Sequence, residues 1–254
     1  MKDILFALKS GFGWLSTIPV GISMEGIEAL MRHVYVFPVV GLIIGAILSL
    51  VAYIAGLALP ANLVAIVVIA AIYQLCGINH IDGLADFGDG VIAHGTREKK
   101  IAAMKDVSLG TGGGVFIAVI LLAAFAIISD IPEALLPAAL LVAEISAKEA
   151  MICFAAFSTS LQKGFGQIMI ERTGPLHFAI GLAISALLCA AVLGPLGLFA
   201  LIVAQVAALY LVTVANRNFG GSTGDGIGAA NELARVVALA AVLTLGGVLP
   251  WMLW

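Results

Sequence analysis

The sequence predicts an all-α membrane protein, a polytopic helix bundle of about seven transmembrane helices with an N-terminal interfacial helix. Hydrophobic residues make up 62% of the 254 residues and charged residues only 11%, and the mean hydropathy is +1.17. Ordinary soluble domains carry about a quarter charged residues. The apolar residues also fall into stretches close to the roughly 20 residues that a helix needs to cross the hydrocarbon core.

Seven stretches are expected to span the membrane, and no internal repeat or linker divides them, so we expect one domain over residues 1–254. The expected spans are residues 34–59, 61–78, 112–128, 132–157, 176–193, 196–215 and 235–254. The stretch 4–20 is apolar but interrupted by Lys9 and two glycines, which favours an interfacial helix. Trp251 and Trp254 are expected to anchor the last span at the far interface.

The distribution of positive charge predicts the orientation. Lys and Arg lie before the first span and in every second connection, whereas the connections around Pro60, 130–133 and 194–195 contain none. Positively charged loops stay on the cytoplasmic side. We therefore expect a multi-pass protein of the cell membrane, with the N-terminus and the long polar loops in the cytoplasm and the C-terminus outside.

Charge and cysteine content limit the partners. The net charge of −3 is too small to predict binding to nucleic acid, so the lipid bilayer and small substrates are the expected partners. Cys76, Cys153 and Cys189 each lie in an apolar run, which favours buried free thiols over disulfides. Assembly into a homo-oligomer is left open.

The most informative stretch is residues 79–90, NHIDGLADFGDG, directly after the second expected span. The spacing of Asp82, Asp86 and Asp89 places three carboxylates on one helix face. Like charges repel there, so a cation is expected between them. Mg²⁺ is commonly held by one or two carboxylates together with substrate phosphates. We therefore predict a magnesium site, with His80 as a candidate base or hydrogen-bond partner. A solvated acidic turn is the alternative.

A glycine-rich stretch, KDVSLGTGGG, follows at residues 105–114. Lys105 supplies a point charge suited to phosphate, and Asp106 is a further candidate metal ligand. Glycines here allow backbone N–H groups to form an anion-binding nest, although a flexible turn is an equal alternative. The expected substrate contacts in this stretch, besides Lys105, are Ser108, Gly110, Thr111 and Gly112.

A second glycine-rich stretch, GGSTGDGIGAANE, occupies residues 220–232 and leads into a helix. A helix N-terminus preceded by glycines favours phosphate binding, and Asp225 could join the aspartates of 79–90 as a metal ligand. A plain linker with a helix cap fits the same residues. The expected substrate contacts are Thr223, Gly224, Asn231 and Glu232.

Charged residues also occur inside the expected spans, where they usually face a partner or a cavity. Glu144 and Lys148 are four residues apart, so they are expected either to pair or to line a polar pocket, and Glu144 is a further candidate substrate contact. Arg235 is expected either to extend toward the cytoplasmic interface or to hold a phosphate.

Three motifs carry a resemblance to a known family. GINHIDGLADFGDG, MKDVSLGTGGG and GGSTGDGIGAANE, in that order between apolar spans and after FPVVGLIIG, resemble those of the cobalamin synthases. These are also called adenosylcobinamide-GDP ribazoletransferases. The resemblance implies a membrane enzyme that joins adenosylcobinamide-GDP to α-ribazole or its 5′-phosphate, releases GMP and requires Mg²⁺.

The resemblance also implies roles for individual residues. Asp82, Asp86 and Asp89 would be metal ligands, and Asp225 or Asp106 would complete the site. Lys105 and the glycine N–H groups would hold the diphosphate. A carboxylate or His80 would act as base toward the attacking hydroxyl.

Three other classes of membrane protein fit less well. A CDP-alcohol phosphotransferase would carry a DGxxAR run, whereas Gly83 is followed by LAD and then by no Arg. A cation transporter would place acidic residues deep in several spans. An intramembrane aspartyl protease needs two facing aspartates within spans, and Asp225 lies in a glycine-rich segment. Polar residues gathered on one side favour an enzyme that takes its substrates from the cytoplasm.

Overall fold

The computed structural model describes residues 2–161 and 165–248, and their regular elements are helices, apart from one isolated β-bridge between Ser160 and Ser222. This confirms the all-α class. The helices are α1 (Lys2–Leu15), α2 (Met24–Arg32), the short 3₁₀-helix η1 (Val34–Val36), α3 (Phe37–Gly56), α4 (Ala61–Cys76), α5 (Asn79–Ile92), α6 (Arg97–Met104), α7 (Thr111–Asp130), α8 (Leu136–Phe157), α9 (Phe165–Arg172), α10 (Pro175–Phe219) and α11 (Gly224–Leu245).

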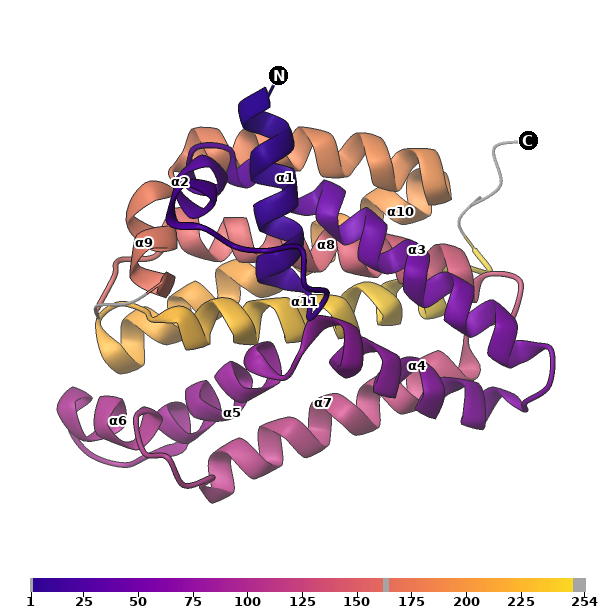
Figure 1. The fold of residues 1–254 in the computed structure, drawn as a ribbon. Coiled ribbons are helices and arrows are strands. Elements are labelled where there is room, and N and C mark those ends of the chain that lie inside the picture. The colour runs from indigo at the N-terminus through magenta and orange to yellow at the C-terminus, as the bar shows by residue number, and fades with distance from the viewer. Residues whose placement is uncertain (1, 162–164, 249–254) are drawn as a thin grey trace.

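Helix α8 forms the centre of the bundle. It packs against α3, α10 and α11, and these helices run side by side in Figure 1. Every residue from Val142 to Ala155 is buried, which is typical of a helix enclosed on all sides. Cys153 lies in this stretch, and it is free and buried like Cys76 and Cys189, as predicted.

Within the described residues, four helical segments are long and apolar enough to cross a membrane: η1 with α3, α7, α10 and α11. Helices α4 and α5 together make a fifth candidate, bent by 95° between them. Helix α8 has 22 residues, as many as α11, but it carries the charged residues Glu144, Lys148 and Glu149 and is not among these candidates. The chain is therefore a multi-pass membrane protein with four or five candidate spans by length and composition.

Helix α10 contains a break that matches the expected boundary between two spans. Its 45 residues include non-helical backbone at Leu193 and Gly194, directly before Pro195. A Cβ placed on Gly197 would meet the carbonyl oxygen of Cys189, although eight residues of straight helix span about 12 Å. The chain therefore doubles back at this point, and the two arms of α10 lie along each other in Figure 1.

The two ends of the chain differ from the expected boundaries. The expected interfacial helix 4–20 is α1, which stops at Leu15. The last helix begins at Gly224, before the expected start of the last span at 235, and it carries Asn231 and Glu232 as expected. Gly226 and Gly228 lie inside this helix, where a Cβ would meet the ring of Phe154 and the carbonyl oxygen of His80, respectively. Trp251 and Trp254 lie outside the described residues.

Candidate active site

Helix α5, which carries the three expected metal ligands, is turned across one end of the bundle. Gly77 separates it from α4 and has φ +70°, a conformation that favours glycine. Helices α5 and α11 then approach closely through glycines. A Cβ on Gly83 would lie 3.0 Å from the backbone of Asp225, and one on Gly228 would lie 2.9 Å from the carbonyl oxygen of His80. The absence of side chains at Gly83 and Gly228 therefore allows α5 and α11 to pack closely against each other.

This packing brings together carboxylates from distant parts of the sequence. The half-buried Asp86 experiences the negative charges of Asp225, Asp82 and Asp89, in decreasing order. The hydroxyl of Thr223 donates a hydrogen bond to Asp225 at 2.9 Å. None of the ion pairs among the described residues includes any of these four aspartates. The end of the bundle therefore carries a concentrated negative charge, and no Lys or Arg in residues 2–161 and 165–248 forms an ion pair with it.

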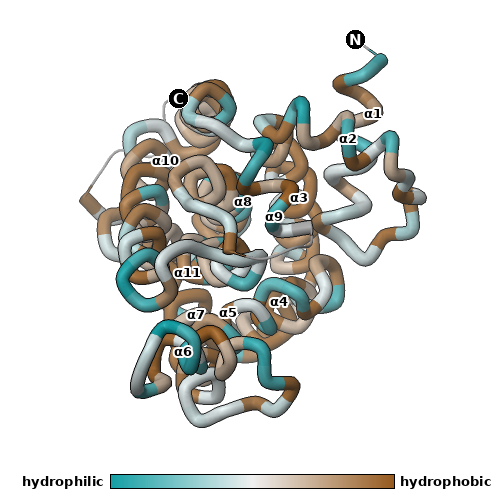
Figure 2. Tube along the Cα trace, turned by 90° about the vertical axis from the view of Figure 1, so that its left-hand side faces the viewer, coloured by the Kyte–Doolittle hydropathy of each residue, from teal (hydrophilic) through white to brown (hydrophobic). Residues whose placement is uncertain are grey.

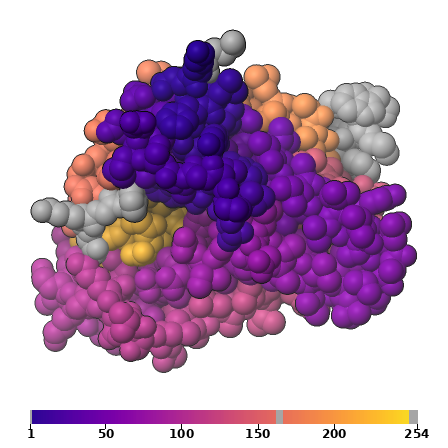
Figure 3. Space-filling model, in the orientation of Figure 1, coloured from indigo at the N-terminus to yellow at the C-terminus, as the bar shows by residue number. Residues whose placement is uncertain are grey.

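Two of the aspartates border a cavity of about 280 Å³, which we call the aspartate cavity. In Figure 3 the N-terminal segment (indigo) overhangs a hollow in which part of α11 (yellow) is visible. No Lys or Arg among the described residues lines the cavity, although it borders an acidic cluster. The residues that line it are Trp14, Cys76, Asn79, His80, Asp82, Met151, Gly166, Met169, Gly224, Asp225, Ile227 and Gly228.

Asp89 has a different environment from the other aspartates. Its carboxylate accepts hydrogen bonds from the N–H groups of Gly110 and Gly113, each at 2.8 Å, and so caps the start of α7. Side chains larger than hydrogen at these two positions would collide with it. The glycine-rich nest was expected to bind a substrate phosphate, but the anion that it holds in this structure is Asp89. A ligand role for Asp89 stays a prediction.

The remaining expected contacts of 105–114 lie around a separate hollow. This hollow, of about 360 Å³, is lined by Asp89, Asp106, Ser108 and residues 110–112, but not by Asp82 or Asp225. The backbone N–H of Ser108 donates to the exposed Asp106 carboxylate at 2.9 Å and holds its pKa below the usual value. Lys105 ends α6 and is exposed. Asp106 is thus not brought to the aspartate cavity.

A second polar cluster lies deeper in the bundle, where α8 meets α11. Glu144 accepts hydrogen bonds from Lys148, at 2.9 Å, and from the Nε of Arg235. Arg235 also donates to Glu232 at 2.6 Å. All four side chains are at most 3% exposed, and their charges cancel. The expected Glu144–Lys148 pair is confirmed, whereas extension of Arg235 toward the interface is wrong because its guanidinium is buried between two carboxylates.

Two neutral side chains complete this cluster, which we call the paired network. Lys148 donates to Asn231 at 2.8 Å, and Asn231 donates to Glu232 at 2.9 Å. The hydroxyl of Tyr73, on α4, donates to Glu232 at 3.0 Å. The network therefore fixes α11 against α8 and α4. Substrate contact by Glu144, Asn231 and Glu232 stays a prediction, and none of the three lines the aspartate cavity.

Sequence reasoning missed several residues of the cavity wall. Trp14 comes from a stretch read as an interfacial helix, and Met151 and Met169 come from stretches read as membrane span and loop. The only available signal was a Trp next to glycine in an otherwise aliphatic stretch. Helix α1 packs against α2, α3 and η1, and which of its residues reach the cavity depends on this tertiary packing.

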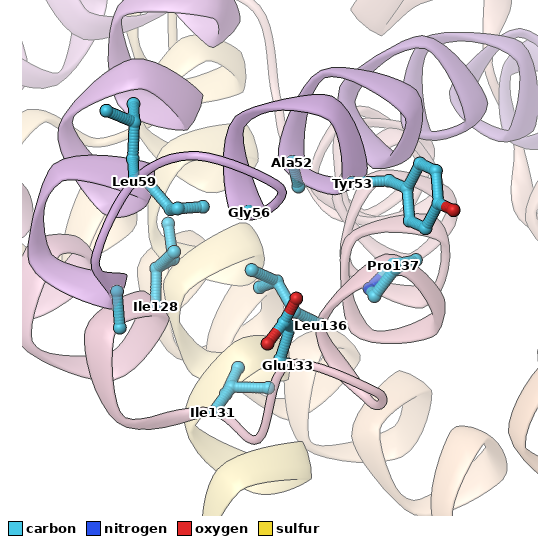
Figure 4. A pocket seen from close by; sticks show the side chains of 11 residues that line it. Ala52, Tyr53, Gly56, Leu59, Ile128, Ile131, Glu133, Leu136 and Pro137 are labelled. Atoms are coloured by element: carbon cyan, nitrogen blue, oxygen red, sulfur yellow. The ribbon is translucent and has the colours of Figure 1, made fainter.

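A small pocket at the opposite end of the bundle differs in chemistry. It occupies about 80 Å³ between α3, α4, α7 and α8, and Glu133 is the one charged residue among those that line it. Figure 4 shows this carboxylate among Ala52, Ile131 and Leu136. Figure 2, which views the other end, shows hydrophilic segments around α6 and α9. The aspartate cavity is accordingly the better candidate active site.

Comparison with known proteins identifies the family. The family model described as cobalamin-5-phosphate synthase matches residues 7–243. The chain belongs to this family. An adenosylcobinamide-GDP ribazoletransferase of Methanosarcina mazei is 39% identical to it, covering 100% of this chain and 99% of that protein.

Two other relatives of the synthase family carry the same name. The protein of Methanococcoides burtonii is 40% identical over 94% of this chain and 92% of its own length. The protein of Caldanaerobacter subterraneus is 34% identical over 92% of this chain and 96% of its own length. No solved structure gives a significant match.

The aspartates of this cobalamin-5-phosphate synthase family member are suited to a magnesium ion. Within residues 2–161 and 165–248, no three His, Cys, Asp or Glu side chains form a ready metal-binding group. Mg²⁺ does not require one, because it keeps several waters and is commonly held by one or two carboxylates plus substrate phosphates. Asp82, Asp86 and Asp225 present carboxylate oxygens close to one another, and no Lys or Arg of the described residues lines the cavity that Asp82 and Asp225 border.

Proposed function

We propose that this protein joins adenosylcobinamide-GDP to α-ribazole, or to its 5′-phosphate, and releases GMP. Family membership and full-length relatives of that name support the activity. The observation that carries the proposed site is the placement of Asp225 beside Asp82 and Asp86, from segments more than a hundred residues apart, at a cavity that no Lys or Arg of the described residues lines.

Asp82, Asp86 and Asp225 hold Mg²⁺ in this proposal. Bound there, the ion would neutralise the diphosphate of the donor and the charge that develops during phosphoryl transfer. The unpaired carboxylates explain why a cation is needed. Four aspartates would otherwise repel a substrate that is itself an anion, and the described residues of the cavity wall include no Lys or Arg to offset that repulsion.

In the proposed reaction, residues of the aspartate cavity position the acceptor α-ribazole, and one of them removes the proton of its attacking hydroxyl. A ribose hydroxyl of α-ribazole attacks the phosphorus that carries the cobinamide, the phosphoanhydride bond breaks, and GMP leaves with the electron pair. Asp82 and His80 both border the cavity and are the two candidate bases for the hydroxyl proton. Burial lowers the pKa of His80 to about 3, so its imidazole is neutral near pH 7 but a weak base, and its buried Nδ1 has no hydrogen-bond partner among the described residues.

The proposed topology has seven crossings: α3, α4, α7, α8, the two arms of α10, and α11. Helices α6 and α9, at the end with the aspartates, carry Lys and Arg, whereas the connections 57–60, 131–135 and 193–195 carry none. By the positive-inside rule the active site faces the cytoplasm. The lipid bilayer surrounds the apolar helices, and self-association is left to experiment.

One assay tests the activity and the metal site together. Membranes that contain the native chain should release GMP from adenosylcobinamide-GDP only when α-ribazole and Mg²⁺ are present, and chelation should stop the reaction reversibly. Glu133→Gln, which alters an exposed carboxylate at the opposite end, is the matched control and should remain active. Absence of GMP release under all these conditions refutes the activity. Undiminished release by both Asp82→Asn and Asp86→Asn refutes the metal site.

A further inference from the structure

A second hollow adjoins the aspartate cavity. It has a volume of about 450 Å³ and lies between the end of α1, the start of α2 and the break between α4 and α5. We call it the N-terminal cleft. Trp14, Cys76 and Asn79 line both the cleft and the aspartate cavity. A ligand held in the cleft would therefore border the space where Asp82 and Asp225 lie.

The N-terminal segment is fastened over this cleft. The backbone N–H of Thr17 donates to the carbonyl oxygen of Leu75 at 2.7 Å, and its hydroxyl donates to that of Gln74 at 2.8 Å. These carbonyl groups belong to the last turn of α4, where no further helical N–H is available to them. Residues 16–23 are thus part of the site wall, in addition to any contact that α1 makes with lipid.

The chemistry of the cleft suits a neutral, flat ring. None of its lining residues among the described part of the chain is charged. Trp14, Ile22 and Ile27 supply an aromatic and aliphatic wall, while Thr17 and Asn79 supply neutral polar groups. Aromatic and apolar walls with a few polar groups are typical of sites for small organic ligands, and 450 Å³ falls within their usual size of about 300–1,000 Å³.

We propose that the N-terminal cleft binds the aromatic base of the α-ribazole acceptor and that Trp14 is a specificity-determining residue that stacks on it. This inference rests on the proposed function. Of the two substrates, the nucleoside fits a cleft of this volume, whereas a corrin ring with its side chains is larger. Asn79 and Asp82 lie one helical turn apart, so the ribose of a nucleoside seated here would extend toward the aspartates.

Steady-state kinetics distinguishes this role from a structural one. Trp14→Ala should raise the KM for α-ribazole roughly 10- to 100-fold, the range for loss of one base–aromatic stack, and leave the KM for adenosylcobinamide-GDP unchanged. Trp14→Phe should restore most of the affinity. Phe12→Ala, an aromatic on the same helix that does not line the cleft, is the matched control. An equal rise in both KM values, or a rise for the donor alone, overturns the proposal.

Direct binding can be read without turnover. The chain has three Trp residues, so Trp251→Phe with Trp254→Phe leaves Trp14 as the sole indole reporter in the full chain. Titration with α-ribazole alone should change Trp14 emission, whereas adenosylcobinamide-GDP alone should not. A response only to the donor, or to neither, overturns the site. A change in Trp14 emission with α-ribazole, in a protein that releases no GMP, supports the cleft as a binding site and refutes the proposed function. Normal GMP release without any change in Trp14 emission supports the proposed function and refutes the cleft as the binding site.

Discussion

The aspartate cavity and the paired network both include residues of α11, in successive turns of this helix. They differ in whether the charged side chains are neutralised by charges of opposite sign. Asp225 lies in the first turn of α11 beside other carboxylates, and it forms no ion pair within the part of the chain that the structure describes. Glu232 and Arg235, two to three turns later, are matched by Glu144 and Lys148 on α8. The network is neutral and buried, and each of its charged side chains is hydrogen-bonded to another member, although the second terminal nitrogen of Arg235 has no partner among the described residues. The cavity instead has carboxylates next to open space.

This difference in charge balance indicates that the charged residues of the paired network stabilise the fold, whereas the carboxylates at the aspartate cavity are suited to binding a ligand. A buried charge without a partner is strongly unfavourable, so the network's members must satisfy one another. Carboxylates beside a cavity can be solvated, and their mutual repulsion is relieved when a cation binds. Similar residues therefore serve stability in one place and binding in the other, and substitutions should separate the two roles.

The largest expected effect is on stability, in the paired network. Glu144→Ala should lower the free energy of unfolding by about 3–5 kcal/mol, because it leaves two buried cations with one carboxylate between them. Thermal unfolding in detergent measures the change, with Glu133→Ala as the exposed control. A melting temperature equal to that of the native chain would show that the network does not stabilise the bundle.

The next effect is on activity, in the aspartate cavity. Asp86→Asn should reduce kcat for GMP release by about 10²–10³-fold, the usual cost of removing an electrostatic contact to the transition state. Its melting temperature should stay the same or rise without Mg²⁺, because one of several neighbouring negative charges is removed. A fall in stability comparable to that of Glu144→Ala would erase the distinction between the two regions.

Tyr73→Phe probes the edge of the network with a smaller change. Loss of the hydrogen bond to Glu232 should cost about 1.5–3 kcal/mol, as for other bonds to charged groups, while GMP release per folded molecule is retained. Parallel measurement of unfolding and of turnover on detergent-purified protein checks both statements. Lost turnover with unchanged stability would instead assign Tyr73 to catalysis.

The smallest expected effect is on stability, at Asp89. Substitutions there test whether this residue only caps α7 or also belongs to the metal site beside the aspartate cavity. Asp89→Ala should destabilise the protein by about 0.5–2 kcal/mol through loss of the cap on α7, and Asp89→Asn by less, because its one amide oxygen can still accept from one of the two N–H groups that the two oxygens of Asp89 bind. If Asp89 is only a cap, Asp89→Asn also keeps its GMP release. Inactivity of a stable Asp89→Asn protein would instead make its carboxylate a metal ligand.

The sequence by itself determined the helical class, the multi-pass character and two of the segments that border the candidate site, 79–90 and 220–232. Hydrocarbon demands long apolar helices whatever their arrangement, so composition and length were sufficient. The i, i+4 and i+7 spacing of Asp82, Asp86 and Asp89 required only helix geometry, and the Glu144–Lys148 pair required only their separation by four residues.

Only the tertiary structure decided which distant residues meet. The pairing of Arg235 with Glu144, the seating of Asp225 against Gly83 and the capping of α7 by Asp89 each join segments separated by other helices. The same structure placed Trp14 at the cavity wall. Local sequence sets the face that a helix presents, but the face it meets depends on side-chain packing across the whole bundle, which no single stretch of the chain encodes.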